Sequence, residues 1–296
     1  MRKKRLPDLM FTAFNTVFMA LIAVITLYPF LHVLAISFND AVDTMKGGIA
    51  IWPREWSFSS YALILQHGQL YDATVMTLMR TSAGLVTALF CTSMVAFSLS
   101  KRYLIGYRLF NGMFVMTMFI SGGLIPTFML YKRLGISNTF WVYVLPGLVS
   151  AFNMILIRNY FDTLPDSMEE SAKIDGANDL VVFFRIILPL SGPILATIAL
   201  FIAVGQWNAW TDTLYFTSDD RLITLQYLLV KIIRQAEAMQ LGNAAKYRFQ
   251  LRSKGTITPE SVKMAITIVT TVPILCVYPF VQRYFVKGML LGAVKE

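Results

Sequence analysis

Six apolar stretches constrain this chain more than any other feature. Each is long enough to cross a lipid hydrocarbon core, which takes about 20 apolar residues in a helix. None contains Lys, Arg, Asp or Glu, and they run over Phe11–Ile36, Thr81–Ser100, Leu109–Tyr131, Thr139–Ile157, Ile186–Thr211 and Met264–Gln282. Lipid offers the backbone no hydrogen-bond partners, so such segments must be helical. The sequence therefore predicts an all-α polytopic membrane protein, with six transmembrane helices in a single domain over residues 1–296.

Composition agrees with lipid as the solvent. The chain is 56% hydrophobic and only 15% charged, whereas soluble domains carry about 25% charged residues. Several prolines fall inside or near the apolar stretches, where membrane helix bundles tolerate them as kinks. A membrane protein is expected, and a soluble globular domain is excluded.

Short loops rich in Lys and Arg mark the cytoplasmic side of a membrane protein. With the N-terminus inside, the inner segments hold 13 of the 26 Lys and Arg residues, whereas the short outer loop holds only Lys132 and Arg133. The long outer segment 212–263 holds eight, but long loops are poor indicators of orientation. An even number of spans then puts both ends in the cytoplasm. This bias accounts for much of the net charge of +9, so no nucleic-acid partner is expected.

Residues 161–189 form a polar inner loop that predicts two short helices around a corner. Pro165 suits a first helical turn, and acidic residues follow it where the helix dipole favours them. Gly176 stands where a C-terminal cap is needed. Asn178 or Asp179 then caps a second helix over Leu180–Ile187. On the first helix, Leu164, Met168 and Ala172 make an apolar stripe, while Glu169 and Lys173 are spaced to pair.

The outer segment 212–263 is too long for a simple turn. Its part from Leu222 to Met239 has apolar residues at helical spacing, which predicts an amphipathic helix outside the bilayer core. Residues 240–258 are polar and predicted to be loose. Asp212, Asp219, Asp220 and Arg221 are either contacts for a soluble partner or a solvated loop.

Several polar and aromatic residues lie within or beside the predicted spans. Polar groups in membrane helices usually face the bundle interior, and sugars bind to hydrogen-bonding groups and aromatic faces. Residues that either line a substrate path or join helices to one another are Asn153, Gln206, Trp207, Asn208 and Trp210. Arg80, just before the second span, is expected to extend to lipid headgroups, with contact to an acidic sugar as the alternative.

The chain shows no catalytic or metal-binding pattern. It has no phosphate-binding loop of the type G-x-x-x-x-G-K-[ST], and we expect neither an enzyme nor a bound cofactor. Cys91 and Cys276 lie inside predicted spans and are expected to be packing residues, without a disulfide or a metal.

The inner loop carries a recognisable pattern. Glu170-Ser171-Ala172, three residues, Gly176, nine residues and then Ile186-Ile187-Leu188-Pro189 resemble the EAA motif of ABC importer permeases, with Ser171 replacing the first alanine. Further likeness is to the carbohydrate branch, of the maltose-system type and its complex-polysaccharide subgroup. It is carried by Asp175-Gly176-Ala177, by Leu188 through Pro193, by Trp207-Asn208 and by the tail from Lys287 to Lys295.

The resemblance implies a bacterial cytoplasmic-membrane permease of the type I importer fold. It would work with a second related permease, two ATP-binding subunits that hold ATP and Mg²⁺, and an extracytoplasmic solute-binding protein. The EAA coupling loop at 161–189 would dock on an ATPase subunit through Glu170, Ser171, Ala172, Asp175, Gly176, Leu188 and Pro189. The expected substrate is an oligosaccharide, with alginate- or pectin-derived acidic ones favoured.

An ion-coupled secondary transporter is the alternative. Such a protein is expected to carry broken half-helices and charged residues within its spans. The absence of charge from all six stretches favours the importer.

Overall fold

The computed structural model describes residues 6–66, 68–101, 103–242, 258, 260–273 and 275–276. The basic residues at 2–5, most of the segment at 240–258, the end of the last predicted span and the tail from Lys287 lie outside these ranges. Within the described ranges the regular elements are helices, with one isolated β-bridge between Asn39 and Trp56. The chain divides into two units, 1–68 with 229–272, and 69–228 with 273–296.

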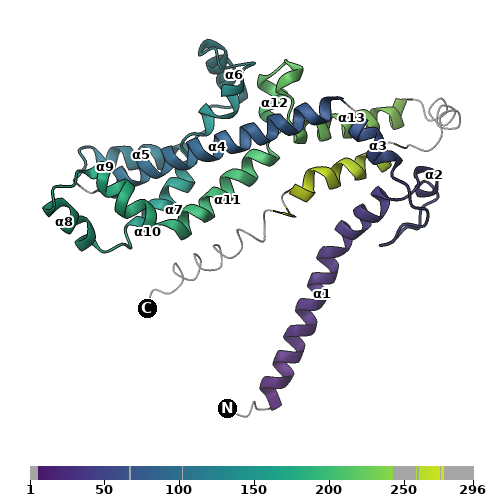
Figure 1. Ribbon diagram of the computed structural model, residues 1–296, viewed down its shortest axis with the longest axis horizontal. Helices are drawn as coiled ribbons and strands as arrows, with labels where there is room; N and C mark the ends of the chain where they lie inside the picture. The colour runs from purple at the N-terminus through teal and green to yellow at the C-terminus, as the bar shows by residue number, and fades with distance from the viewer. Residues whose placement is uncertain are drawn as a thin grey trace. The chain divides into compact units, whose positions relative to one another are not determined.

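The first unit is built on α1, a long apolar helix over Leu6–Ser37 (Figure 1). Most of α1 is exposed along its length, and only its end joins a small core of Ala35, Ile36 and Ile49. The short helices α2 (Ala41–Thr44) and α3 (Ser59–Gln66) follow, and residues 260–273 are also helical. An exposed apolar helix of this length is stable only with lipid or another helix around it.

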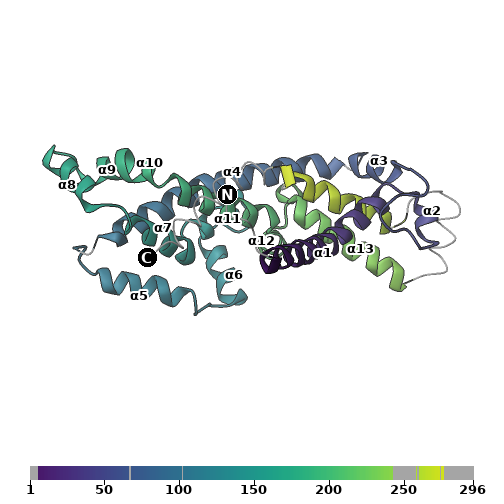
Figure 2. The same cartoon turned by 90° about the horizontal axis from the view of Figure 1, so that it is seen from below.

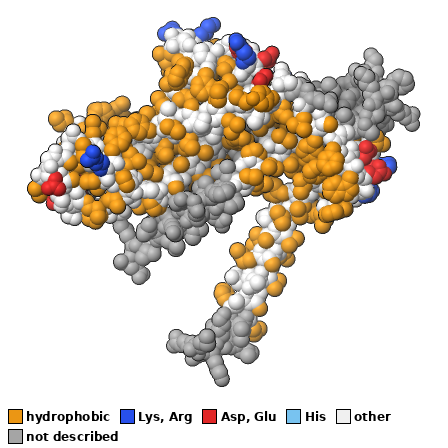
Figure 3. Space-filling model, viewed as in Figure 1, with side chains coloured by type: hydrophobic (Ala, Val, Ile, Leu, Met, Phe, Trp, Pro, Cys, Tyr) orange, Lys and Arg blue, Asp and Glu red, His pale blue; other side chains and the backbone are white. Residues whose placement is uncertain are grey.

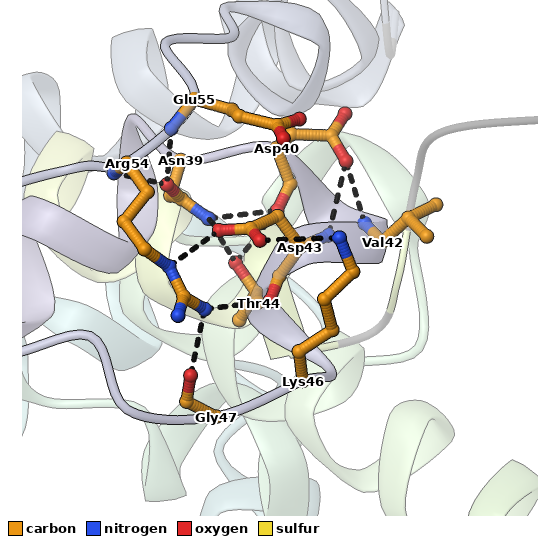
Figure 4. Close-up of polar contacts among 9 residues, drawn as sticks. All are labelled: Asn39, Asp40, Val42, Asp43, Thr44, Lys46, Gly47, Arg54 and Glu55. Atoms are coloured by element: carbon orange, nitrogen blue, oxygen red, sulfur yellow. Dashed lines mark hydrogen bonds and ion pairs between the residues drawn. The ribbon is translucent and has the colours of Figure 1, made fainter.

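Asn39 organises the loop that follows α1 (Figure 4). Its side-chain NH₂ donates to the Asp40 carbonyl, Asp43 and Thr44, and its side-chain oxygen accepts the Arg54 and Glu55 amides at 2.8 and 3.0 Å. The Arg54 guanidinium also pairs with Asp43 at 3.0 Å. The Asn39 hydrogen bond is the largest influence that lowers the pKa of Asp43. One buried amide thus holds both sides of the loop together.

The second unit is arranged along α4, a helix over Gly68–Ser100 (Figure 2). Beside it lie α7 (Ala151–Phe161) and α11 (Gly192–Asn208). The other elements of this unit are α5 (Tyr107–Thr117), α6 (Leu124–Arg133), η1 (Phe140–Tyr143), η2 (Leu145–Gly147), α8 (Asp166–Ile174), α9 (Asp179–Val182), η3 (Phe183–Ile187), α10 (Leu188–Leu190), α12 (Thr211–Phe216), η4 (Asp220–Leu222) and the start of α13 (Leu225–Gly242).

Only two described helices, Met10–Ser37 and Gly68–Ser100, are individually long and apolar enough to cross a membrane. Two bent pairs could each make one span, Phe140–Gly147 with Ala151–Phe161 at 45° and Asp179–Leu190 with Gly192–Asn208 at 83°. The stretch predicted as one span at Leu109–Tyr131 holds α5 and α6 with a break at 118–123. α5 ends at Thr117, and Gly123, with φ +80°, directly precedes the start of α6. The number of six spans stays a prediction.

Two apolar cores stabilise the second unit. The larger joins Ala96, Phe97, Met154, Ile157 and Ile198 from α4, α7 and α11, and it also includes Val182, Phe183 and Ile187. The smaller contains Met76, Val142, Tyr143, Val144 and Leu222.

The surface seen in Figure 3 is largely hydrophobic, with charged side chains gathered at a few places. Such a surface suits lipid and partner subunits better than water.

We predict that Asn39→Ala loosens the loop after α1. It leaves the Arg54 and Glu55 amides without their acceptor, and each lost buried hydrogen bond of this kind costs about 1–3 kcal/mol. Hydrogen exchange of those two amides should accelerate by more than tenfold. Val42→Ala, an exposed change in the same loop, should leave the exchange rates unchanged; equal exchange in both variants would contradict the assigned role of Asn39.

Candidate coupling elbow and polar cavity

The inner loop contains a helix, α8, that begins directly after Pro165 and ends at Ile174. Pro165 occupies the capping position, one residue earlier than predicted, and Asp166 and Glu169 lie in the first turn. The side chains of Glu170 and Ser171 are exposed, and Ile174 is 85% exposed. We call α8, the Gly176 corner and the helical segment 179–190 the coupling elbow.

Gly176 makes the corner of the coupling elbow. Its φ is +86°, which is the left-handed conformation that glycine adopts without steric cost. The Gly176 amide donates to the Lys173 carbonyl at 3.0 Å, and the Ala177 amide donates to the Ala172 carbonyl at 2.9 Å. This pair of hydrogen bonds is the Schellman arrangement that closes a helix C-terminus.

The second arm of the elbow starts at Asn178, whose side chain accepts the Val181 amide at 2.9 Å. The arm is α-helical in α9 and then makes a π-helical turn over Phe183–Ile187. Pro189 follows, and its missing N–H and its ring disfavour the regular i−4 bond to Arg185. A π-turn beside a proline is a recognised way to accommodate such a kink. The chain then bends by 83° into α11.

The elbow is fastened to the end of α4. Val182, Phe183 and Ile187 are buried in the larger core, with the Phe183 ring 5.2 Å from that of Phe97. Lys101, just beyond α4, pairs with Glu169 of α8 in a half-buried position. The Lys101 ammonium also lies 4.6 Å from the Phe97 ring centre. Both arms therefore contact the same end of one long helix.

One expectation for α8 is wrong. Glu169 and Lys173 do not pair with each other, because Glu169 pairs with Lys101 and Lys173 pairs with Asp179 at 3.0 Å. The Asp179 carboxylate, followed by the Tyr103 hydroxyl, raises the pKa of Lys173. Met168 is 44% exposed, whereas Leu164 and Ala172 do pack on the core. Lys101, just beyond the end of α4, thus takes Glu169, and Asp179, at the start of α9, takes Lys173.

The remaining predicted coupling residues divide by exposure. Asp175, Gly176 and Pro189 are exposed, whereas Ala172 and Leu188 are half-buried against the larger core. The exposed ones present polar and small groups outward, and the half-buried ones attach the elbow to its unit.

A polar cavity lies towards the other end of α4. Its volume is about 270 Å³, and its lining residues are Arg80, Tyr131, Val142, Tyr143, Pro146, Gly147, Gln206, Ala209, Asp212 and Phe216. Arg80 is only 1% exposed. Its guanidinium donates to both Asp212 oxygens, at 2.5 and 3.1 Å, and to the Gln206 side-chain oxygen at 3.0 and 3.2 Å. It also lies 4.4 Å from the Tyr143 ring centre.

The expectation that Arg80 extends to lipid headgroups is therefore wrong. Asp212, predicted to be either solvated or in contact with a soluble partner, instead lies inside the same unit and pairs with Arg80. A buried arginine is tolerated where its charge is neutralised and its donors are satisfied. A signal for this pair is present in the sequence, because Arg80 directly precedes one predicted span and Asp212 directly follows another, both at the outer end.

Gln206 is the predicted path residue that the structure brings into this cavity. Its NH₂ group donates to the Tyr143 carbonyl at 3.2 Å. A Cβ on Gly84 would lie 2.7 Å from the Gln206 amide nitrogen, so α4 and α11 approach closely there. Trp207 is buried, Asn208 is exposed, and Asn153 and Trp210 are half-buried. None of these four lines the cavity.

Among the described residues, no group of three or more His, Cys, Asp or Glu side chains is arranged to hold a metal ion. The elbow offers an exposed helix, and the cavity offers hydrogen-bonding and aromatic groups. With two of the described helices long and apolar enough to cross a membrane, these features are those expected of a membrane component of a transport system.

The chain belongs to the family of binding-protein-dependent transport system inner membrane components, whose pattern matches residues 1–291. It is 39% identical to the polygalacturonan/rhamnogalacturonan transport system permease protein YtcP of Bacillus subtilis (strain 168) over 294 residues, 99% of each chain. It is 35% identical to Protein LplC of the same organism over 286 residues, 96% of this chain and 95% of the relative.

A solved structure is also similar. It is a chain of a bacterial ABC transporter involved in the import of the acidic polysaccharide alginate, with a TM-score of 0.85 and 30% sequence identity. The match covers 96% of this chain and 100% of that one. The helical fold and the permease class follow from these likenesses together with the family.

We predict that Gly176→Val strains the elbow, because a residue with a Cβ in the left-handed region costs about 1–2 kcal/mol. No neighbour lies within 4 Å of the Cβ position, so the cost comes from the backbone alone. Gly176→Asn should be milder, since Asn tolerates this conformation. Hydrogen exchange of the Gly176 and Ala177 amides should accelerate in the order Gly, Asn, Val; equal rates would contradict the corner.

We predict that Lys101→Glu detaches α8 from α4, because two carboxylates then meet in a half-buried place. The apparent melting temperature of the purified transporter should fall. The exchanged pair Lys101→Glu with Glu169→Lys should recover part of the loss, as expected for a direct interaction. A double variant no better than the sum of its single changes would refute the contact.

Proposed function

We propose that this chain is one of two related membrane-spanning permeases in an ATP-driven importer of oligosaccharides. It crosses the bacterial cytoplasmic membrane six times with both ends inside, and segment 212–263 lies on the outer side. Two separate ATP-binding subunits supply the energy, and a solute-binding protein delivers the sugar from outside. The family membership supports this arrangement and argues against an ion-coupled secondary transporter.

The geometry of the coupling elbow carries the proposal. α8 is exposed, and it is held in place by a glycine corner, an ion pair and three buried side chains. A helix held in this way can move as a rigid body together with the elements to which it is attached. We propose that α8 inserts into a groove on an ATPase subunit. Small Ser171 permits close approach, and Glu170 meets a basic group of that subunit. Closure of the ATPase subunits then moves the elbow and, through Lys101 and Phe97, the long helix α4.

The proposed substrates are oligosaccharides released from acidic polysaccharides such as pectins. Support comes from the relative at 39% identity, a polygalacturonan/rhamnogalacturonan transport system permease, and from the solved neighbour at 30% identity, which belongs to an importer of alginate. Both likenesses extend over nearly the whole chain, so the substrate path is included in the comparison.

We predict that Ser171→Trp blocks docking without unfolding the chain, because Ser171 is exposed. The complete transporter should be expressed with its second permease and ATPase subunits, and co-purification of the ATPase subunits measured. A loss of at least tenfold is expected. Ser218→Trp makes the same change at an exposed position after α12 and should leave co-purification intact. Normal ATPase recovery with Ser171→Trp would overturn the docking role.

A second test addresses the substrate. The complete wild-type transporter and its binding protein in proteoliposomes should import labelled tetragalacturonate when ATP is enclosed with the ATPase subunits. Import should stop with a hydrolysis-deficient ATPase. A transporter that assembles and hydrolyses ATP but imports no oligosaccharide would contradict the proposed substrate class.

A further inference from the structure

The polar cavity around Arg80 has a definite position relative to the coupling elbow. Arg80 lies on α4, and Lys101 is the first residue after the end of this helix. The two residues are 21 positions apart. At 1.5 Å per residue this is about 30 Å along the helix axis, which equals the thickness of a bilayer hydrocarbon core, about 30 Å. With the elbow inside, as proposed above, the cavity lies near the outer membrane face, where a delivered sugar first enters.

The lining has the composition of a saccharide site. Ligand cavities combine apolar and aromatic walls with a few fixed polar groups. Here Tyr131 and Phe216 form an aromatic wall with ring centres 4.8 Å apart. Asp212 has a side chain 24% exposed and can accept further hydrogen bonds. The Tyr131 hydroxyl makes no hydrogen bond to any residue that the structure describes, and it is available as both donor and acceptor.

The ion pair between Arg80 and Asp212 determines which groups of a sugar the cavity can bind. Arg80 is already neutralised by Asp212 and also bonded to Gln206. A carboxylate from an acidic sugar would have to displace Asp212, which would leave a largely buried carboxylate without its cation, a strongly unfavourable state. Ring hydroxyls need no such exchange, because they can donate to Asp212 and bond to Tyr131 while the ion pair stays closed.

We infer that this cavity is an entry subsite that binds one ring of the transported saccharide through its hydroxyl groups, with Tyr131 and Asp212 as contacts and the paired Arg80 as a positioning residue. The inference rests on the proposed function as an oligosaccharide importer. It adds that this chain recognises the neutral, hydroxyl-bearing part of the ring. Carboxylates of an acidic chain are bound elsewhere in the transporter.

The test uses the complete transporter in lipid nanodiscs, with hydrolysis-deficient ATPase subunits held in ATP and Mg²⁺. Binding of labelled tetragalacturonate is compared with binding of the same tetrasaccharide after carboxyl reduction. Tyr131→Phe removes one hydroxyl and keeps the aromatic wall. We expect a roughly three- to tenfold weaker affinity, as for one lost hydrogen bond, and the same factor for both probes.

A second variant fills the cavity. Gly147 lines it, and a Cβ there would make only ordinary contact, 3.6 Å from the Gln206 amide nitrogen. Gly147→Leu should weaken binding of both probes by more than tenfold while the complex assembles normally. Gly112→Leu is the matched control, because a Cβ on Gly112 meets no atom within 4 Å and Gly112 is remote from the cavity lining.

The outcomes distinguish failure of the proposed subsite from failure of the proposed importer function. Unchanged affinity in Tyr131→Phe and Gly147→Leu would overturn the subsite while leaving the importer intact. A loss confined to the acidic probe would overturn the hydroxyl assignment, because the cavity would then recognise the carboxylate. A wild-type transporter that neither binds nor imports either probe would overturn the proposed substrate class and the subsite with it.

Discussion

The ion pair between Lys101 and Glu169 joins the two parts of this molecule that a transporter must connect. It links α8, which has an exposed face, to the end of α4, the longest helix in the second unit. An exposed ion pair would contribute little, but this one is half-buried beside the Phe97 ring. Removing either partner would leave a charge in apolar surroundings, which is costly. The attachment is therefore specific, and removal of one partner alone is unfavourable.

The long helix α4 carries both functional regions. Its Phe97 packs under the elbow, and its Arg80 belongs to the polar cavity, where Gln206 reaches it from α11. A helix of 33 residues without proline joins the two places. α4 and α11 approach each other closely at Gly84. We propose that movement of the elbow is passed along α4 to the cavity.

Much of this fold was predictable from local sequence, whereas the tertiary pairing was not. Pro165, Gly176 and Asn178 act through their own backbone geometry, and the corner was predicted at the residue where it occurs. Glu169 and Lys173 have suitable spacing on one helix, yet Glu169 pairs with Lys101, far away in sequence, and Lys173 pairs with Asp179 across the Gly176 corner. Arg80 was assigned to lipid because no partner is near it in sequence; Asp212, 132 positions later, becomes its partner only after folding. The span predicted at Leu109–Tyr131 is interrupted between Thr117 and Leu124, where apolar continuity alone gave no warning of a break.

The central claim is that the coupling elbow faces the cytoplasm and is covered there by an ATPase subunit. The most direct measurement labels Ser171→Cys, with Cys91 and Cys276 replaced by Ser, using a membrane-impermeant maleimide. The account predicts no labelling in intact cells, labelling in inverted vesicles stripped of ATPase subunits, and protection when those subunits are restored. Labelling from outside in intact cells would contradict it.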